Sequence, residues 1–493
     1  MLGTISTGFI LIRGGSVILD GTRLERADIL VAGDRIQQVG PVLACPPDAT
    51  VIEASEQIVL PGLVNAHTHA HNNLVKGTEA RWTLEDHLNN APAQMQSRSP
   101  DEQYDSAAVG AIEMLKTGCT TAYDLFMEMP TPTEEGAEAV MRAYGDVGMR
   151  AVLAPAITDM AFYRTVPGLI DLLPDELRAR VGRLTAAPAP ALVEITDRMI
   201  RRWHGSASGR IRTAVAPSIP GQCSDELLEG CLRLSREHGV GIHTHLCETK
   251  TQAVHARRRW GRTVVEHLAE LGMLGPDFVG AHAIWLTDDD VRRLGDAGVS
   301  VAHNAASNLR LGSGIAPVRE LLDAGVNLAL GTDGSATSDT LNMFDSMRMA
   351  ALINRVRFPY GQDHWLDARA AWQMATTGSA RALGIPDMGR IAPGQVADLV
   401  LLDRNSIFLT PLNDPLTALV FCEPGTEVRT VLVGGRVVLR DATVLTVDEV
   451  SIRRRAQDAA DRLQRDNEGL RQFAASLAPY LSNACQAAYS EPF

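Results

Sequence analysis

The chain of 493 residues contains few cysteines and no paired cysteine motif. Its seven cysteines are scattered, at positions 45, 119, 223, 231, 247, 422 and 485. Thiolate zinc sites and redox centres use closely spaced pairs, and disulfide frameworks use an even number. We therefore expect reduced cysteines and a cytoplasmic location. If a metal is bound, histidines must hold it.

The chain also lacks an excess of positive charge and a long apolar run. Lys and Arg total 46 against 59 Asp and Glu, a formal net charge of −13. This balance argues against nucleic acid or an anionic membrane as the main partner. The N-terminal stretch MLGTISTGFILIRGG is broken by Gly and Arg and lacks a cleavage signal. Neither a membrane span nor a secretory signal is expected.

The two ends of the chain share one sequence pattern. Short β-branched runs alternate with turns over residues 10–60 and again over 397–445. Asp20-Gly21, Gly33-Asp34 and Gly434-Gly435 stand between apolar alternations, which is typical of β-hairpins. We interpret the likeness as one small β-sandwich domain built from both ends, over residues 1–61 and 388–448.

Strands and helices alternate in the region between, residues 62–387. A helix is expected over 99–116, because Ser99 can cap it and Pro100 takes its first position. Eight strands can be counted, which predicts an α/β protein with a (β/α)8 TIM barrel. Residues 447–475 are charge-rich and helical in pattern. They predict a helical extension over 449–493, for which an exposed surface helix is favoured over a subunit contact.

Histidines recur where the predicted strands end. His67 and His69 end the first strand, and the fifth to eighth end at His245, His282, His303 and Asp333. These ends lie on one face of a barrel, where active sites are built. One HxH pair or one strand-end histidine is more often structural, but five strand ends together predict a site. Three imidazoles and a carboxylate suit Zn²⁺ or Fe²⁺ with an open position for water.

A second HxH pair, His243 and His245, leaves a choice of ligand. Glu248 follows His245 closely and could act as a general acid or base, which favours His245 as the ligand. His243 is then expected to pack deeper in the barrel. The remaining histidines that we assign to surface or capping positions are His71, His204, His238, His255, His267 and His364.

Several motifs, in order, resemble the metal-dependent amidohydrolase superfamily. They are PGLVNAHTH, HTHLCET, AHAIWLTDDDV, AHNAASNLRLGSGIAPV, GTDGSATSDTLNMF and GRIAPGQVADLVLLD. The resemblance covers about residues 10–445. It is to the branch of aminohydrolases that act on N-heterocycles, which includes guanine, 8-oxoguanine and S-adenosylhomocysteine deaminases and s-triazine hydrolases. It implies a barrel with a small β-sandwich built from both chain ends.

The resemblance implies roles for the strand-end residues. His67, His69, His245 and Asp333 would bind one divalent metal, usually zinc, with iron as the alternative. Asp333 would also take a proton from the metal-activated water. Glu248 would protonate a ring nitrogen, and His282 would stabilise the developing charge. Binuclear relatives need a lysine at the end of strand four. This strand ends TAVAPSIPGQ, so one metal is expected.

The implied reaction is attack by metal-bound hydroxide on a planar heterocycle such as a purine, pterin or s-triazine, with release of ammonia or an amine. One alternative is hydrolysis of a cyclic amide, urea, carbamate or aryl C–Cl bond at the same site. Another is an inactive scaffold. Trp82 and His303 are candidate substrate contacts. Ser218 stands where S-adenosylhomocysteine deaminases carry histidine, which makes a nucleoside less favoured. A homodimer is the family-like expectation.

Overall fold

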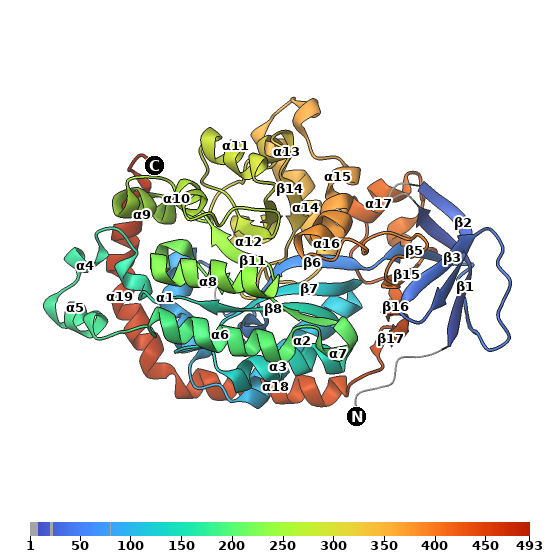
Figure 1. The fold of residues 1–493 in the computed structure, drawn as a ribbon, viewed down its shortest axis with the longest axis horizontal. Helices are drawn as coiled ribbons and strands as arrows, with labels where there is room; N and C mark the ends of the chain where they lie inside the picture. The colour runs from blue at the N-terminus through green and yellow to red at the C-terminus, as the bar shows by residue number, and fades with distance from the viewer. Residues whose placement is uncertain (1–7, 20–22, 79) are drawn as a thin grey trace.

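The computed structural model describes residues 8–19, 23–78 and 80–493. It consists of a barrel surrounded by helices and a smaller β domain at one end of the long axis (Figure 1). The predicted turn at Asp20-Gly21 lies outside the described residues. Within the described ranges, no helix is long and apolar enough to cross a membrane.

The barrel is made of parallel strands that alternate with helices. Its strands are β6 (Leu63–Thr68), β7 (Cys119–Phe126), β8 (Arg150–Ile157), β9 (Ile211–Thr213) with β10 (Ala216–Pro217), β11 (Ile242–Leu246), β12 (Phe278–His282), β13 (Ser300–His303) and β14 (Asn327–Leu330).

Two short links close the barrel. Val215 forms a parallel bridge with Ile242, which joins the β6–β10 sheet to the β11–β14 sheet. Asp333, just beyond β14, donates its N–H to the carbonyl of His67 on β6 at 2.9 Å. The predicted α/β barrel is therefore confirmed, and its eight strands coincide with the eight predicted from the sequence.

Both chain ends contribute to the small β domain, as predicted. A mixed nine-stranded sheet has the order β18-β17-β16-β15-β5-β1-β2-β3, with β4 paired to β1. Its strands are β1 (Phe9–Leu19), β2 (Arg23–Ala32), β3 (Arg35–Gly40), β4 (Thr50–Glu53), β5 (Gln57–Pro61), β15 (Leu399–Asp403), β16 (Val428–Val433), β17 (Arg436–Arg440) and β18 (Thr443–Val444).

A buried ion pair fastens this sheet to the barrel. Asp398, just before β15, accepts hydrogen bonds from Nε and Nη2 of Arg150 on β8, at 3.3 and 3.2 Å. It also accepts the N–H of Gly434 in the β16–β17 turn at 2.7 Å. The side chains of Arg150 and Asp398 are only 9% and 1% exposed, so the pair is shielded from solvent.

Helices cover the barrel. They are α1 (Leu84–Met95), α2 (Pro100–Lys116), α3 (Glu134–Val147), α4 (Leu169–Leu172), α5 (Asp175–Gly182), α6 (Ala189–Trp203), α7 (Ser206–Gly209), α8 (Asp225–His238), α9 (Lys250–Trp260), α10 (Val264–Glu270), α11 (Asp288–Asp296), α12 (Ala305–Arg310), α13 (Val318–Asp323), α14 (Met343–Arg357), α15 (Ala368–Gln373), α16 (Ser379–Ala382) and α17 (Pro415–Phe421).

Helix α2 begins as the sequence predicted. Ser99 is its N-cap, with Pro100 in the first turn. The Ser99 hydroxyl accepts the N–H of Glu102, and the Glu102 carboxylate accepts the N–H of Ser99. This reciprocal pair satisfies two backbone donors that the first turn leaves without helical partners.

The C-terminal extension forms two helices, α18 (Glu449–Asp466) and α19 (Glu468–Tyr489), which run beside α1 and α2 (Figure 1). Ile452, Ala456, Ala459 and Leu463 are the buried residues of α18. Its charged residues are mostly exposed, as expected for a surface helix, while the buried face packs against α2.

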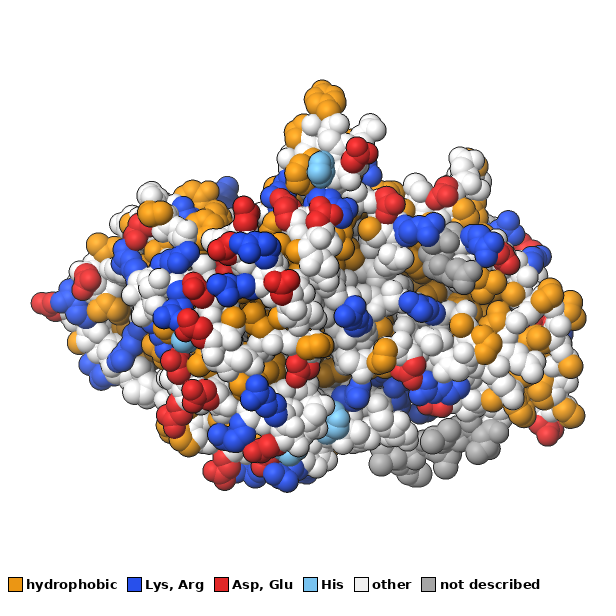
Figure 2. Space-filling model, turned by 45° about the horizontal axis from the view of Figure 1, so that its top comes forward, with side chains coloured by type: hydrophobic (Ala, Val, Ile, Leu, Met, Phe, Trp, Pro, Cys, Tyr) orange, Lys and Arg blue, Asp and Glu red, His pale blue; other side chains and the backbone are white. Residues whose placement is uncertain are grey.

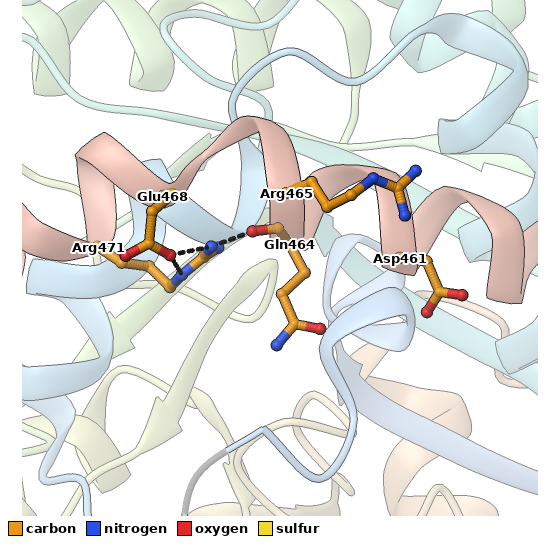
Figure 3. Close-up of a pocket in the computed structure, with 5 residues that line it drawn as sticks. All are labelled: Asp461, Gln464, Arg465, Glu468 and Arg471. Carbon is orange, nitrogen blue, oxygen red and sulfur yellow. Dashed lines mark hydrogen bonds and ion pairs between the residues drawn. The ribbon is translucent and has the colours of Figure 1, made fainter.

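Charged side chains line a surface pocket where α18 meets α19. Asp461, Gln464, Arg465, Glu468 and Arg471 form its wall, and Arg471 pairs with Glu468 at 2.7 Å (Figure 3). On the face shown in Figure 2, basic and acidic side chains are interspersed and form no continuous basic area. The predicted metal site lies elsewhere, at the carboxyl ends of the barrel strands.

Candidate active site

The carboxyl ends of β6, β11, β12 and β14 place the predicted site residues together. The ligating atoms of His67, His69 and His245 lie within 4.8 Å of one another, and so do those of His67, His282 and Asp333. In the parallel pairing of β11 with β12, Leu246 lies opposite His282. All these residues are nearly excluded from solvent, with 8% exposure or less.

Several strand ends here adopt an unusual backbone conformation. Cys247, His282, Ala283 and Asp333 have φ values of 48°, 71°, 49° and 66°. Positive φ is unfavourable for residues with a Cβ and persists where the surroundings enforce it. The chain therefore turns sharply at three strand ends, and His282 and Asp333 stand on these turns.

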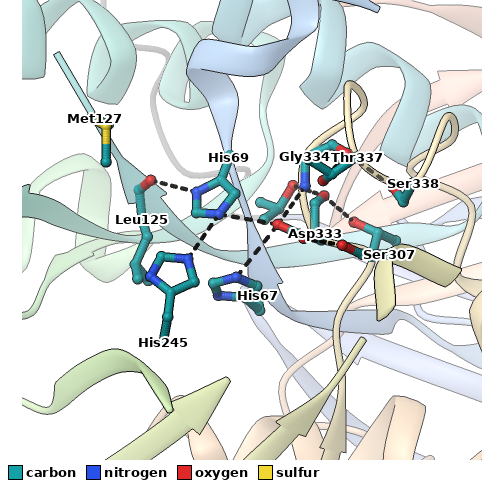
Figure 4. A network of polar contacts seen from close by, with 12 residues as sticks. His67, His69, Leu125, Met127, His245, Ser307, Asp333, Gly334, Thr337 and Ser338 are labelled. Carbon is teal, nitrogen blue, oxygen red and sulfur yellow. Dashed lines mark hydrogen bonds and ion pairs between the residues drawn. The ribbon is translucent and has the colours of Figure 1, made fainter. Parts of the chain in front are cut away.

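The Nε2 atoms of the His69 and His245 imidazoles point toward each other. Nδ1–H of His69 donates to the Leu125 carbonyl at 2.7 Å, and Nδ1–H of His245 donates to the Ser218 carbonyl at 2.6 Å. In the neutral rings both Nε2 atoms must then be acceptors. These two atoms are 3.2 Å apart (Figure 4). Two acceptors at this distance need a cation or a proton between them.

Asp333 and His67 complete this group of donors. Oδ1 of Asp333 lies 3.0 Å from Nε2 of His69 and 3.5 Å from Nε2 of His67. Burial lowers the pKa of His67 to about 3, and its Nε2 has no hydrogen-bond partner within the described part of the chain. Three imidazoles with oriented Nδ1 atoms, together with a carboxylate, are a donor set that fits a divalent metal.

The orientation of Asp333 is fixed from two sides. Oγ of Ser307, on α12, donates to Oδ2 at 2.5 Å, and the N–H of Gly334 donates to Oδ1 at 2.8 Å (Figure 4). Ser307 is fully buried. It was not singled out in the sequence, since a single serine carries no spacing signal.

Glu248 and His282 lie beside the histidine group. Oε2 of Glu248 is 3.6 Å from Nε2 of His282. Burial raises the pKa of the Glu248 carboxyl well above its usual value, with further contributions from the charges of Asp333 and Glu85. Nδ1–H of His282 donates to Oδ1 of Asn308 at 2.8 Å, which leaves Nε2 as an acceptor. One group is therefore set to give a proton and the other to take one.

A cavity opens onto these residues. His69, His245, Glu248, His282 and Asp333 form its polar end. Leu84, Leu88, Ala91, Met95, Met127 and Ile219 form most of its apolar wall. An apolar cavity with a few converging polar groups is the usual form of a small-molecule site.

Two further histidines line this cavity. His71 is 4% exposed and His87, on α1, is 7% exposed. The expectation of a surface or capping role for His71 was wrong, and it was also wrong for His267, which is buried beside Trp260. His71 lies in the short 3₁₀ helix Ala70–Val75 directly after β6, and the alternation His67, His69, His71 could have indicated it.

The other predicted contacts lie farther from the reacting groups. His243 packs beneath His67, with its Nε2 3.2 Å from Nδ1 of His67. His303 is buried, and burial lowers its pKa to about 4. Trp82 is half-buried, with its ring 6.3 Å from that of His87. Neither His303 nor Trp82 is among the cavity-lining residues, and their substrate roles stay predictions.

Comparison with known proteins identifies the family. The model of the amidohydrolase family matches residues 58–438. The chain belongs to the amidohydrolase family. It is 36% identical over 455 residues to 5'-deoxyadenosine deaminase of Methanothermobacter thermautotrophicus, which covers 91% of this chain and 97% of that protein. It is 34% identical to the 5-methylthioadenosine/S-adenosylhomocysteine deaminase of Caldanaerobacter subterraneus subsp. tengcongensis, over 86% of this chain and 91% of that protein.

Solved structures of this amidohydrolase's relatives have the same fold. Atrazine chlorohydrolase from Arthrobacter aurescens TC1, complexed with zinc, superposes with a TM-score of 0.84 at 29% identity, over 92% of this chain and all of that one. An adenosine deaminase from Xanthomonas campestris with bound zinc gives 0.81 at 26% identity, over 92% and 98%. This amidohydrolase is a hydrolase of carbon–nitrogen bonds, of the metal-dependent deaminase class that acts on heterocycles.

Proposed function

We propose that this enzyme removes the amino group of an aminopurine nucleoside of the adenosine type, with one zinc ion per chain. The observation that carries the metal is the facing pair of Nε2 atoms of His69 and His245, 3.2 Å apart, with Oδ1 of Asp333 3.0 Å from the first of them. The names of the sequence relatives support the nucleoside. Ser218 stands where S-adenosylhomocysteine deaminases carry histidine, and on that ground the sequence favoured other heterocycles over a nucleoside. The names of the relatives weigh against that preference.

His67, His69, His245 and Asp333 would hold a divalent metal, which would lower the pKa of the attacking water toward neutrality. Asp333, held by Ser307 and Gly334, accepts a proton from the attacking water. Glu248 is kept protonated by burial and donates its proton to a ring nitrogen, which makes the adjacent carbon electrophilic. His282 accepts a proton at Nε2. Water adds to the carbon, Asp333 passes the proton that it accepted to the amino group, and the C–N bond breaks with release of ammonia.

Ammonia release from the zinc-loaded protein tests this proposal. The panel contains adenosine, 5'-deoxyadenosine, guanine and an amino-s-triazine. Glu248→Gln keeps the side-chain shape but cannot donate the proton, so its kcat should fall by about 10²–10⁴. Glu229→Gln, an exposed change on α8, should leave kcat unchanged. Full activity of Glu248→Gln would refute this mechanism.

The second candidate function is hydrolysis of another bond at the same site, which the likeness to atrazine chlorohydrolase favours. The mass of the product distinguishes three outcomes, which are replacement of an amino group by oxygen, hydrolytic opening of the ring, and loss of chloride. A protein that binds no zinc and turns over nothing would instead be an inactive scaffold. Homodimer formation stays a proposal, which light scattering of the eluting protein tests.

A further inference from the structure

His71 is held in one orientation from outside the histidine group. Its Nδ1 lies 3.0 Å from the backbone N of Met127, which follows β7. Its carbonyl accepts Nη1 of Arg98 at 2.5 Å, and its ring meets Phe126 edge-on, with centroids 6.5 Å apart. These contacts anchor the backbone and one edge of the ring before any ligand enters.

The hydrogen bond to Met127 also fixes where the ring proton resides. A backbone N–H can only donate, so Nδ1 of His71 must be an acceptor and the ring must be neutral. The proton of the neutral ring is then on Nε2, which makes Nε2–H a donor. Within residues 8–19, 23–78 and 80–493, no group forms a hydrogen bond with this Nε2.

The position of His71 places this donor near the reacting groups but outside the metal cluster. The His71 ring lies 5.0 Å from the His69 ring, centroid to centroid. His71 is absent from both sets of ligating atoms that lie within 4.8 Å of one another. It lines the same cavity as Glu248, so a heterocycle bound there can meet both side chains.

We propose that His71 is a specificity-determining residue whose Nε2–H donates a hydrogen bond to an acceptor on the substrate. This inference rests on the proposed deaminase function and narrows its substrate class. The substrate must carry a ring nitrogen or carbonyl oxygen in addition to the ring atom that Glu248 protonates. A heterocycle that presents an N–H or amino group to His71 is rejected, because two donors then face each other.

Two substitutions separate the two nitrogen atoms of His71. His71→Asn places an amide oxygen near the position of Nδ1, so it can still accept the Met127 N–H, but it has no group at Nε2. His71→Gln places its amide near Nε2 and loses the acceptor for Met127. The readouts are kcat/KM and zinc content of the whole protein, for substrates in which one ring nitrogen at a time is replaced by C–H.

The wild type should lose about tenfold in kcat/KM on one such analogue, as expected for one hydrogen bond. His71→Asn should have the same kcat/KM on that analogue as on the unmodified substrate. His71→Gln should still show the roughly tenfold loss on the analogue. Zinc content should be unchanged in both variants. Unchanged discrimination in His71→Asn, or loss of its zinc, would overturn the proposal.

A spectroscopic measurement decides the inference without turnover. ¹⁵N NMR of ring-labelled histidines, with His71 assigned from the His71→Asn spectrum, should show Nε2 protonated and Nδ1 unprotonated. A proton on Nδ1 would refute the inference even in an active enzyme. If the wild type releases no ammonia from any compound, the proposed function fails, and the NMR result still decides the state of His71.

Discussion

Ser307 gives the sharpest test of how this site is supported. Its hydroxyl is the hydrogen-bond donor to Oδ2 of Asp333, at 2.5 Å, while Oδ1 faces the histidines. Ser307 is fully buried and Asp333 is 3% exposed, so solvent cannot replace a deleted hydroxyl. Ser307→Ala therefore leaves one carboxylate oxygen without its donor and lets the ligand rotate. Loss of such a supporting contact weakens metal binding about 10- to 100-fold, or about 1.4–2.7 kcal/mol.

Competition with a chromophoric zinc chelator measures this loss directly. Ser338→Ala is the matched control. Ser338 is also a buried serine beside Gly334, but its hydroxyl donates to the Gly334 carbonyl at 3.0 Å. Zinc affinity should fall in Ser307→Ala and stay within about twofold of the wild type in Ser338→Ala. A folded Ser307→Ala protein with wild-type zinc affinity would refute the supporting role of this hydroxyl, and an equal loss in both variants would show a general packing effect.

Two further predictions concern buried charges away from the site. Asp398→Asn leaves Arg150 as an uncompensated buried cation and should destabilise the protein by about 3–5 kcal/mol in urea unfolding, while Asp398→Leu with Arg150→Met should recover most of it. A loss below about 1 kcal/mol in the single variant would contradict this. Burial raises the pKa of Glu423 from 4.5 to about 7, so the folded state favours the protonated carboxyl and stability falls as pH rises between these values. Glu423→Gln should thus stabilise the protein by about 3 kcal/mol at pH 8 and by almost nothing near pH 4.5. Equal effects at both pH values would sink the assignment.

The strand order and the strand-end residues could be predicted because they depend on local signals. Ser99 and Pro100 mark a helix start by chemistry within one turn, and His67 and His69 share a strand side by the period of two. The barrel then requires that distant strand ends meet. The barrel topology therefore predicted that His245 and Asp333 lie close to His67 and His69.

The remaining features depend on contacts that no local pattern records. His87 lines the cavity because it lies on α1, which contributes several of the lining residues. Ser307 reaches Asp333 because α12 begins two residues after β13 ends. The buried face of α18 is a different case. Ile452, Ala456, Ala459 and Leu463 follow a spacing of three to four residues, which indicates a buried helix face. The charged residues between them led to the expectation of a solvated helix.

The site combines features that are each unfavourable in an isolated protein. Acceptor nitrogens of His69 and His245 face each other, and Nε2 of His67 is buried without a hydrogen bond within the described part of the chain. Backbone at His282 and Asp333 adopts positive φ. Such strain persists at functional sites because the surrounding fold enforces it. Because one cation at the meeting point would relieve the repulsion of all these lone pairs together, the histidines are better explained as ligands than as packing residues.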